Sequence, residues 1–219
     1  MTHSSASSPS APLDVRVLEL LVSRLCHDMV SPIGAVNNGI ELIEELGEGM
    51  EEQAVELIAQ SGRRAASRLQ CFRLAYGAAG AQAPMAPAEV RPVAEGWLGD
   101  KVTMDWRVAP ADVPASPPAG AAKVLLNAVM LADEALTYGG TVAVTPAEGG
   151  AAGLAVTASG RSAALGDERR DALDGAVPVE ALTPRTVHAY VTGLFARHYG
   201  LDLAFDQPAG DRLVLRLAL

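Results

Sequence analysis

The chain has 219 residues, of which 49% are hydrophobic and 20% are charged, a composition typical of folded globular proteins. This length allows one large domain or two modest ones. The formal net charge of −9 disfavours nucleic-acid binding, because neutralising phosphates requires a basic surface. We therefore expect protein or small-molecule partners and no nucleic acid.

Three features of the sequence predict where in the cell the protein is found. Cys26 and Cys71 lie in apolar helical patterns without the spacing of a zinc site or a disulfide framework, which favours a reducing cytoplasm. Residues 1–12 lack the basic and apolar regions of a signal peptide, and we interpret them as a disordered tail. The apolar runs are shorter than the roughly 20 residues of a transmembrane helix, so no membrane association is expected.

Residues 13–79 carry a helical pattern with two apolar stripes. The apolar positions of the first stripe recur at spacings of three and four: Leu18, Val22, Leu25, Met29, Ile33, Val36, Ile40 and Ile43. After a break at residues 47–49, a second stripe runs from Ala54 to Tyr76 and stops at Gly77. The two helices predict an antiparallel hairpin. Since a lone hairpin leaves one face apolar, we expect two copies to pair as a homodimeric four-helix bundle.

The pattern changes after the Ala-, Gly- and Pro-rich residues 78–87, and we interpret residues 80–219 as a second domain. Strands are predicted there from alternating or short apolar runs at residues 102–108, 141–145, 154–158, 201–205 and 213–217. Helices are predicted at residues 121–136 and 184–199, the second with Thr183 as its N-cap. The expected fold is α+β, a helical hairpin followed by a two-layer α/β sandwich with a mixed sheet.

His27 does not share the apolar stripe of its helix. At about 100° per residue it lies roughly opposite Leu25 and Met29, so we expect its imidazole to face solvent. An isolated surface histidine is usually only tolerated, but Asp28 is placed to accept a hydrogen bond from Nδ1–H. That contact would leave the Nε2 lone pair pointing outward as a nucleophile, although adjacent helical residues diverge.

Pro32 lies inside the same predicted helix, about one turn after His27. Proline removes a backbone hydrogen bond and costs about 3 kcal/mol in an ordinary helix interior. Two interpretations stay open at this point: a kink that helps to expose His27, or a bend that the bundle tolerates.

The run from Cys26 to Ile33, CHDMVSPI, resembles the phosphoacceptor motif of sensor histidine kinases, in which His and an acidic residue are followed by three residues and Pro. The order of a hairpin and an α/β domain also resembles a complete kinase core, with a dimerisation domain followed by an ATP-binding domain. The motif is specific around His27, whereas the second domain matches in its order of elements.

The nucleotide-binding motifs of that kinase family are degraded in this chain. Asn127 matches an earlier position of the first motif, but Leu131 stands where the Mg²⁺-binding Asn is expected. The adenine-reading Asp is replaced within residues 157–162 (TASGRS), where an alanine cannot accept the adenine amine. The glycine-rich lid, whose backbone would hold phosphates, has no counterpart between Leu182 and Tyr190.

A phosphohistidine motif on a kinase-like body with a degraded nucleotide site resembles the ChpT-type histidine phosphotransferases of alphaproteobacterial cell-cycle signalling, over roughly residues 13–219. The resemblance implies a phosphorelay in which His27 takes a phosphoryl group from the receiver domain of a CckA-like hybrid histidine kinase. It further implies delivery to CtrA-like and CpdR-like response regulators. A pseudo-ATPase domain, no ATP-dependent kinase activity and no cofactor of its own are implied as well, with Mg²⁺ supplied by the partner receiver.

In such a relay His27 is the expected nucleophile, with Asp28 orienting its ring. Receivers are expected to dock on residues of the same outer helix face and of one loop in the second domain: Leu20, Arg24, Ser31, Gly34, Asn38 and Arg161, the last with Arg169 and Arg170. An ordinary solvated surface explains each of these about as well, and Leu20 is alternatively covered by the N-terminal tail. His188 and His198 lack carboxylate or cysteine partners at ligand spacing and are interpreted as packing or capping residues.

Two other functions are compatible with the sequence. One is an active histidine kinase with divergent ATP motifs, and the other is a non-catalytic dimeric signalling scaffold. Autophosphorylation with labelled ATP alone distinguishes the kinase, and loss of phosphoryl flow in His27→Ala distinguishes the scaffold.

Overall fold

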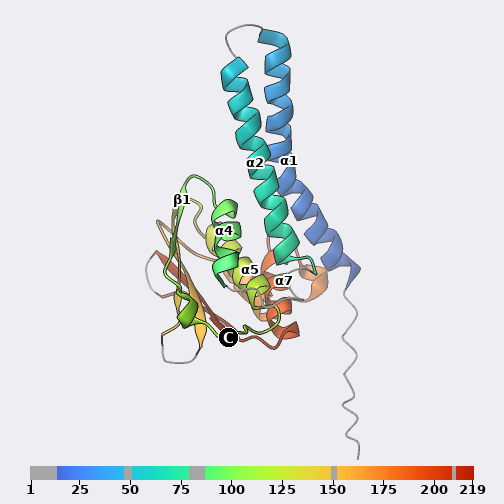
Figure 1. The fold of residues 1–219 in the computed structure, drawn as a ribbon. Coiled ribbons are helices and arrows are strands. Elements are labelled where there is room, and N and C mark those ends of the chain that lie inside the picture. The colour runs from blue at the N-terminus through green and yellow to red at the C-terminus, as the bar shows by residue number, and fades with distance from the viewer. Residues whose placement is uncertain (1–13, 47–50, 79–86, 149–151, 209–210) are drawn as a thin grey trace, which may run out of the picture.

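Two long antiparallel helices begin the computed structural model, which describes residues 14–46, 51–78, 87–148, 152–208 and 211–219. α1 spans Val15–Leu46 and α2 spans Glu51–Ala75, and the two lie side by side (Figure 1). Asp14 acts as the N-cap of α1, because its Oδ1 accepts the backbone N–H of Arg16 at 2.8 Å. The predicted hairpin is confirmed.

Three expectations fall on the segments between these ranges. The expected tail at residues 1–12 and the expected break at residues 47–49 lie outside the described residues, as does most of the expected linker at residues 78–87. The proposed domain boundary at residue 80 falls there too and stays a prediction.

A glycine allows the close approach of the two helices. A Cβ atom at Gly39 would lie 2.5 Å from Ile58 Cγ1 and 3.3 Å from the Ala54 carbonyl oxygen, both on α2. α1 also stays helical through the buried Pro32 and changes direction along its length (Figure 1). The helix therefore accommodates the proline by bending and does not end at it.

The rest of the chain forms a sheet with helices packed on one side. Its elements are, in chain order, α4 Pro87–Trp97, β1 Val102–Trp106, the 3₁₀ turn η1 Pro110–Asp112, α5 Ala121–Glu134, β2 Gly140–Pro146, β3 Gly153–Ser159, α6 Asp167–Asp174, the 3₁₀ turn η2 Val179–Ala181, α7 Val187–His198, β4 Leu203–Asp206 and β5 Arg212–Ala218. The strand order is β1-β2-β3-β5-β4. β1 pairs with β2 in parallel and the other pairs are antiparallel, which confirms the predicted mixed sheet.

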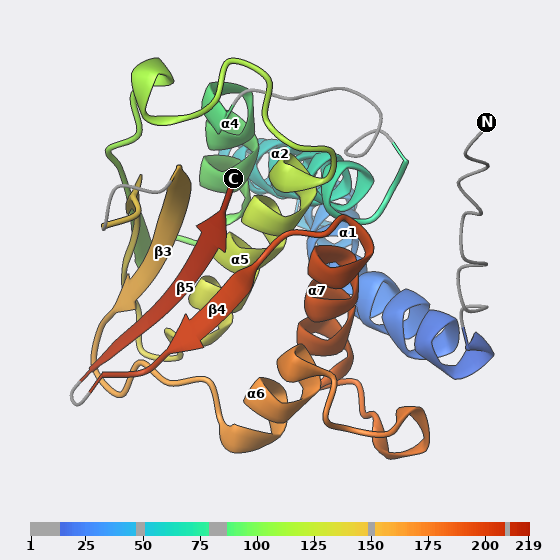
Figure 2. The ribbon, with the colours of Figure 1, turned by 90° about the horizontal axis from the view of Figure 1, so that it is seen from below.

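The helices cover one face of this sheet only. Figure 2 shows α5 and α7 beside the strands, and α5 contacts β2, β3 and β5. Alternate strand residues point into this layer and are buried, for example Val142, Val156 and Leu215, whereas Arg212 and Arg216 on the opposite face are exposed. The structure is the expected two-layer α/β sandwich preceded by a helical hairpin.

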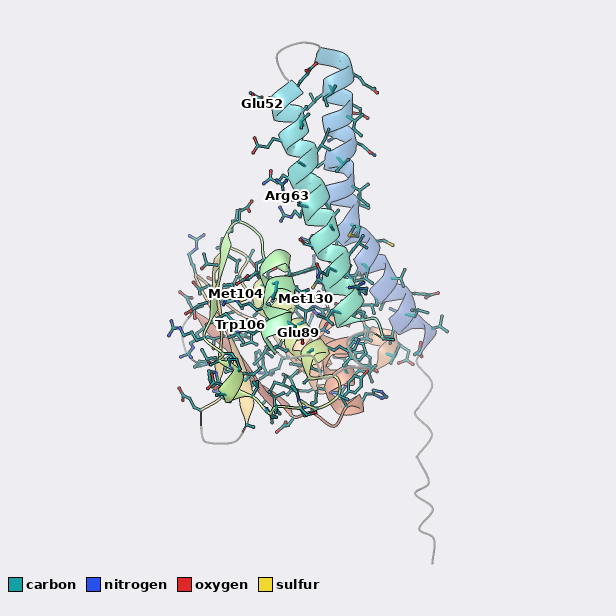
Figure 3. The ribbon with its side chains drawn as sticks, viewed as in Figure 1. Glu52, Arg63, Glu89, Met104, Trp106 and Met130 are labelled. Atoms are coloured by element: carbon teal, nitrogen blue, oxygen red, sulfur yellow. The ribbon has the colours of Figure 1, made fainter. Side chains whose placement is uncertain are left out.

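The hairpin and the sandwich share one hydrophobic core. Phe72 of α2 packs edge-on against Trp97 of α4, with ring centroids 5.6 Å apart. Met130 of α5 lies where the helical layer meets the hairpin (Figure 3), and its Sδ is 3.6 Å from Cys71 Sγ. Burial raises the pKa of the Cys71 thiol to about 12, as expected for a thiol inside a core. None of the described helices is long and apolar enough to cross a membrane.

Two helices and one helix start differ from the predictions. The sequence predicts no helix at α4, where Pro87 and Pro92 interrupt the pattern, and none at the short polar α6, which lacks an apolar stripe. α7 begins at Val187 and not at Pro184, since residues 183–186 form a turn in which the Thr186 hydroxyl accepts the Thr183 N–H at 3.0 Å.

Candidate functional site

His27 projects from an uninterrupted stretch of α1 into solvent. Its side chain is 89% exposed, as the helical phase predicted, and the neighbouring Cys26, Val30 and Ser31 are exposed as well. A long helix holds its side-chain positions more firmly than a loop does. The imidazole is therefore accessible to a second protein while its Cα position is fixed.

Asp28 lies between His27 and another charged residue of the same helix. Its Oδ1 is 3.6 Å from His27 Nδ1, slightly longer than a hydrogen bond, and its Oδ2 is 4.0 Å from Arg24 Nε. The carboxylate is therefore close enough to form the expected contact after a small side-chain rotation. The Arg24 Nε atom is buried and has no hydrogen-bond partner among the described residues.

Arg24 joins α1 to the C-terminal domain. Its guanidinium forms a hydrogen-bonded ion pair with Glu134, the last residue of α5, and the side chains of both residues are only 15% exposed. Arg24 was expected to be a free docking residue on the outer face. The structure instead places most of its side chain at the junction of the helical hairpin and the C-terminal domain. Its role in docking stays a prediction.

Glu134 is surrounded by positive groups. His188 Nδ1 of α7 lies 2.5 Å from Glu134 Oε1, and Arg169 of α6 lies 4.0 Å from Oε2. Burial opposes the charged form of Glu134, but its contacts with His188, Arg24 and Arg169 outweigh this effect and lower the pKa of the carboxyl to about 2. The carboxylate is thus ionised at neutral pH and accepts contacts from three helices.

His188 extends these contacts to α2. It is fully buried, and its Nε2 lies 3.1 Å from Asn127 Oδ1 of α5. The Asn127 amide nitrogen donates to the carbonyl oxygens of Ala75 at 3.1 Å and Lys123 at 2.8 Å. The packing role expected for His188 is therefore incomplete, because both ring nitrogens contact polar side chains.

Lys123 forms the far end of this polar group. Its Nζ donates to the carbonyl oxygens of Ala75 at 3.2 Å and Gly77 at 2.7 Å, and it lies 4.6 Å from the Phe195 ring centroid. Burial lowers the pKa of its ammonium group to about 8. Lys123 and Asn127 thus both bind the main chain where α2 ends.

We name the set of Arg24, Asn127, Glu134 and His188 the Glu134 cluster. The sequence alone does not predict this cluster, because its members come from three helices far apart in the chain. One signal was present: α5 is apolar at most positions, yet polar residues recur at helical spacings in Lys123, Asn127 and Glu134. Polar residues in phase on a buried helix indicate a buried polar partner.

The other expected docking residues differ in accessibility. Ser31 and Asn38 are exposed, and a Cβ atom at Gly34 would meet no heavy atom within 4 Å, so this part of α1 is open. Leu20 is half-buried and packs against the shared core, which leaves less of it exposed than expected. Arg161 follows β3, is exposed, and stacks at 4.2 Å on the Tyr138 ring.

Residues that the sequence resemblance assigned to degraded nucleotide motifs are part of the core. Leu131 of α5 and Ala158 of β3 are fully buried, and Asn127 is bonded within the Glu134 cluster. His198 lies exposed at the end of α7, with its ring edge-on at 4.8 Å from the ring of the adjacent Tyr199.

Known proteins resemble this chain over most of its length. A family model described as histidine phosphotransferase C-terminal domain matches residues 87–211. The protein phosphotransferase ChpT of Brucella abortus (strain 2308) is 34% identical over 209 residues, which cover 92% of this chain and 97% of the relative. A solved structure of a bacterial phosphotransferase is 32% identical, with a TM-score of 0.74, over 96% of this chain and 100% of that one.

Proposed function

This chain belongs to the histidine phosphotransferase family, and we propose that it carries a phosphoryl group on His27 between the receiver domains of a two-component phosphorelay. The observation that carries this proposal is the 89% exposed imidazole of His27 on a rigid helix, with the Asp28 carboxylate beside its Nδ1. A phosphoryl carrier needs this combination of access and a defined tautomer.

The proposed transfer needs no reactant beyond the two proteins. His27 keeps its proton on Nδ1, near Asp28, and the Nε2 lone pair attacks the phosphorus of the aspartyl phosphate of a receiver. An N–P bond forms as the P–O bond breaks, and the receiver carboxylate leaves. Attack by the carboxylate of a second receiver on the phosphohistidine reverses these bond changes and completes the relay.

We propose that the donor is the receiver domain of a CckA-like hybrid histidine kinase and that the acceptors are CtrA-like and CpdR-like response regulators. The receiver brings Mg²⁺, which neutralises the transferring group. The open surface around Ser31, Gly34 and Asn38 supports docking of a receiver on this side of α1. Arg161 is exposed, so a receiver could also contact the C-terminal domain there.

We also propose that the C-terminal domain holds no nucleotide. The polar side chains that α5 carries toward α2, Lys123 and Asn127, are occupied by main-chain carbonyls and by His188. Free Cys26 and Cys71 are compatible with the proposed cytoplasmic location.

We propose that the protein acts as a homodimer. Exposed apolar side chains form a stripe at helical spacing along α1: Val15, Leu18, Val22, Ile33 and Ile40, each at least 45% exposed. Val55 and Leu69 on α2 are exposed as well. Such a stripe on a helical hairpin is covered by a second hairpin in four-helix bundles.

The experiment is a two-step transfer assay. The receiver of the hybrid kinase, carrying labelled phosphate, is mixed with the full chain and then with an unlabelled response regulator. We expect label to reach the regulator with the native chain and not with His27→Ala. Equal delivery by His27→Ala would overturn the proposal, and labelling of the chain by ATP alone would favour the kinase alternative.

A further inference from the structure

The Glu134 cluster raises the question of why charged groups are buried between the helical hairpin and the C-terminal domain. A buried ion pair costs desolvation energy, and apolar residues of similar size often stabilise a core as well or better. α5 is buried along residues 121–132, so an apolar residue at Glu134 would extend its packing surface. Stability alone therefore does not explain why charged side chains and not apolar ones occupy this site.

A chain of contacts leads from this cluster to His27. Glu134 binds the Arg24 guanidinium, Arg24 Nε lies 4.0 Å from Asp28 Oδ2, and Asp28 Oδ1 lies 3.6 Å from His27 Nδ1. Side-chain exposure is 15% at both Glu134 and Arg24, 21% at Asp28 and 89% at His27. The C-terminal domain is therefore in contact with the phosphoacceptor histidine through two side chains of α1.

The two ends of this series of side-chain contacts differ in freedom of movement. Glu134 is fixed by His188 at 2.5 Å, and His188 is in turn fixed by Asn127 at 3.1 Å. Arg24 and Asp28 are joined only at ion-pair distance, so their relative position depends on where Glu134 holds the guanidinium. Without Glu134, Arg24 would be free to pair fully with Asp28 and draw its carboxylate away from His27.

We propose that Glu134 is a positioning residue for phosphoryl transfer at His27. Fixed by His188, it holds Arg24, and through Arg24 it keeps the Asp28 carboxylate beside Nδ1 so that Nε2 stays the free nucleophile. The C-terminal domain thereby supports the phosphoacceptor helix. This inference rests on the proposed function of His27.

The test compares Glu134→Gln with Asp133→Asn. Asp133 is the adjacent carboxylate of α5, is partly buried, and accepts a hydrogen bond from Trp97 Nε1 at 3.1 Å, so its replacement removes a similar group outside the chain of contacts. Three quantities are measured on the full-length chain: the tautomer of His27 by ¹⁵N NMR, the affinity for the unphosphorylated donor receiver, and the maximal rate of transfer from the phosphorylated receiver.

For Glu134→Gln we expect a loss of the Nδ1–H tautomer of His27 and a fall of about tenfold in the maximal transfer rate, with receiver affinity unchanged. Asp133→Asn should leave the tautomer and the rate as they are. A loss of stability in Glu134→Gln would lower the folded fraction, but it would not change the tautomer of His27 within the folded protein.

If Glu134→Gln does not fold, Glu134→Asp is measured in its place. It keeps the carboxylate but shortens it by one methylene, so the same changes are expected because it cannot reach both Arg24 and His188. The inference is overturned if the variant that folds matches Asp133→Asn in tautomer and rate while His27→Ala blocks transfer. If His27→Ala itself transfers normally, the proposed function fails, and that outcome overturns the inference with it.

Discussion

Arg24 of α1 and Glu134 of α5 form an ion pair between the hairpin and the C-terminal domain, 110 residues apart in sequence. The pair lies at the end of α5 and one helical turn before the exposed His27. It connects the C-terminal domain to the proposed phosphoryl carrier. Mutations of this pair and of the residues around it can separate the effects of charge, of packing and of receiver access on stability and phosphoryl transfer.

Glu134 should make the free energy of unfolding fall as the pH is lowered into the acid range. The pKa of Glu134 is about 2 in the folded protein and 4.5, the ordinary value, in the unfolded chain. Its contribution to the stability of the fold is therefore present above pH 4.5 and is lost as pH falls through about 2. Urea unfolding of the native chain and Glu134→Gln should differ by on the order of 3 kcal/mol at neutral pH and converge toward pH 2. A difference that stays constant over this range would contradict the assigned pKa.

Asn127 should contribute strongly to stability through its three polar contacts. Asn127→Ala leaves His188 Nε2 without its Asn127 partner and removes one of the two side-chain donors to the Ala75 carbonyl, the other being Lys123 Nζ. We expect a loss of about 2 to 4 kcal/mol in the free energy of unfolding. Asn38→Ala on the exposed face of α1 is the control and should change it by less than about 0.5 kcal/mol. Equal effects would mean that the buried contacts add little.

The two glycines of α1 should respond in opposite directions to alanine. Gly34→Ala places its methyl in open space and should raise the free energy of unfolding by up to about 1 kcal/mol. Gly39→Ala forces Ile58 away from α1 and should lower it by about 1 to 3 kcal/mol. Thermal unfolding of both variants measures this, and a stabilised Gly39→Ala would show that the hairpin adapts at this contact.

Much of this arrangement could be predicted from the sequence, because it depends on local periodicity. The phase of α1 placed His27 on the outer face, and short apolar runs located the five strands. The spacing from Leu18 to Ile43 predicts a single apolar stripe, whereas the structure divides it into two sets. Leu18, Val22, Ile33 and Ile40 are exposed, and Leu25, Met29, Val36 and Ile43 are half-buried. A single period cannot separate two adjacent apolar faces of one helix.

The Glu134 cluster could not be predicted because it depends on how distant elements pack. His188 lies 54 residues after Glu134 and 61 after Asn127, and no local pattern links these positions. α4 could not be predicted for a different reason, since Pro87 and Pro92 interrupt the helical pattern of its segment.

The exposed stripe on α1 should control assembly. Ile33→Asp places a charge in the proposed dimer interface, and we expect the chain to become monomeric in light scattering because the desolvation cost of the carboxylate disfavours association. Gln60→Asp adds the same charge at an exposed position of α2 and should leave the mass unchanged. A dimeric Ile33→Asp would place the interface elsewhere.

The open surface beside His27 should control receiver docking. Gly34→Leu adds a side chain where a Cβ meets no atom of the chain, and we expect it to weaken receiver binding about tenfold by blocking close approach of a partner helix. Gln60→Leu is the control for an added surface leucine. If binding calorimetry gives the same affinity for both variants, the receiver docks on another face.

The location of the phosphoryl group tests the central claim most directly. The chain is phosphorylated by the labelled donor receiver, digested at neutral pH to preserve phosphohistidine, and sequenced by mass spectrometry. We predict a single modified residue, His27, and an unmodified protein in His27→Ala. Phosphate on His188, on an aspartate, or on no residue of the native chain would contradict the account.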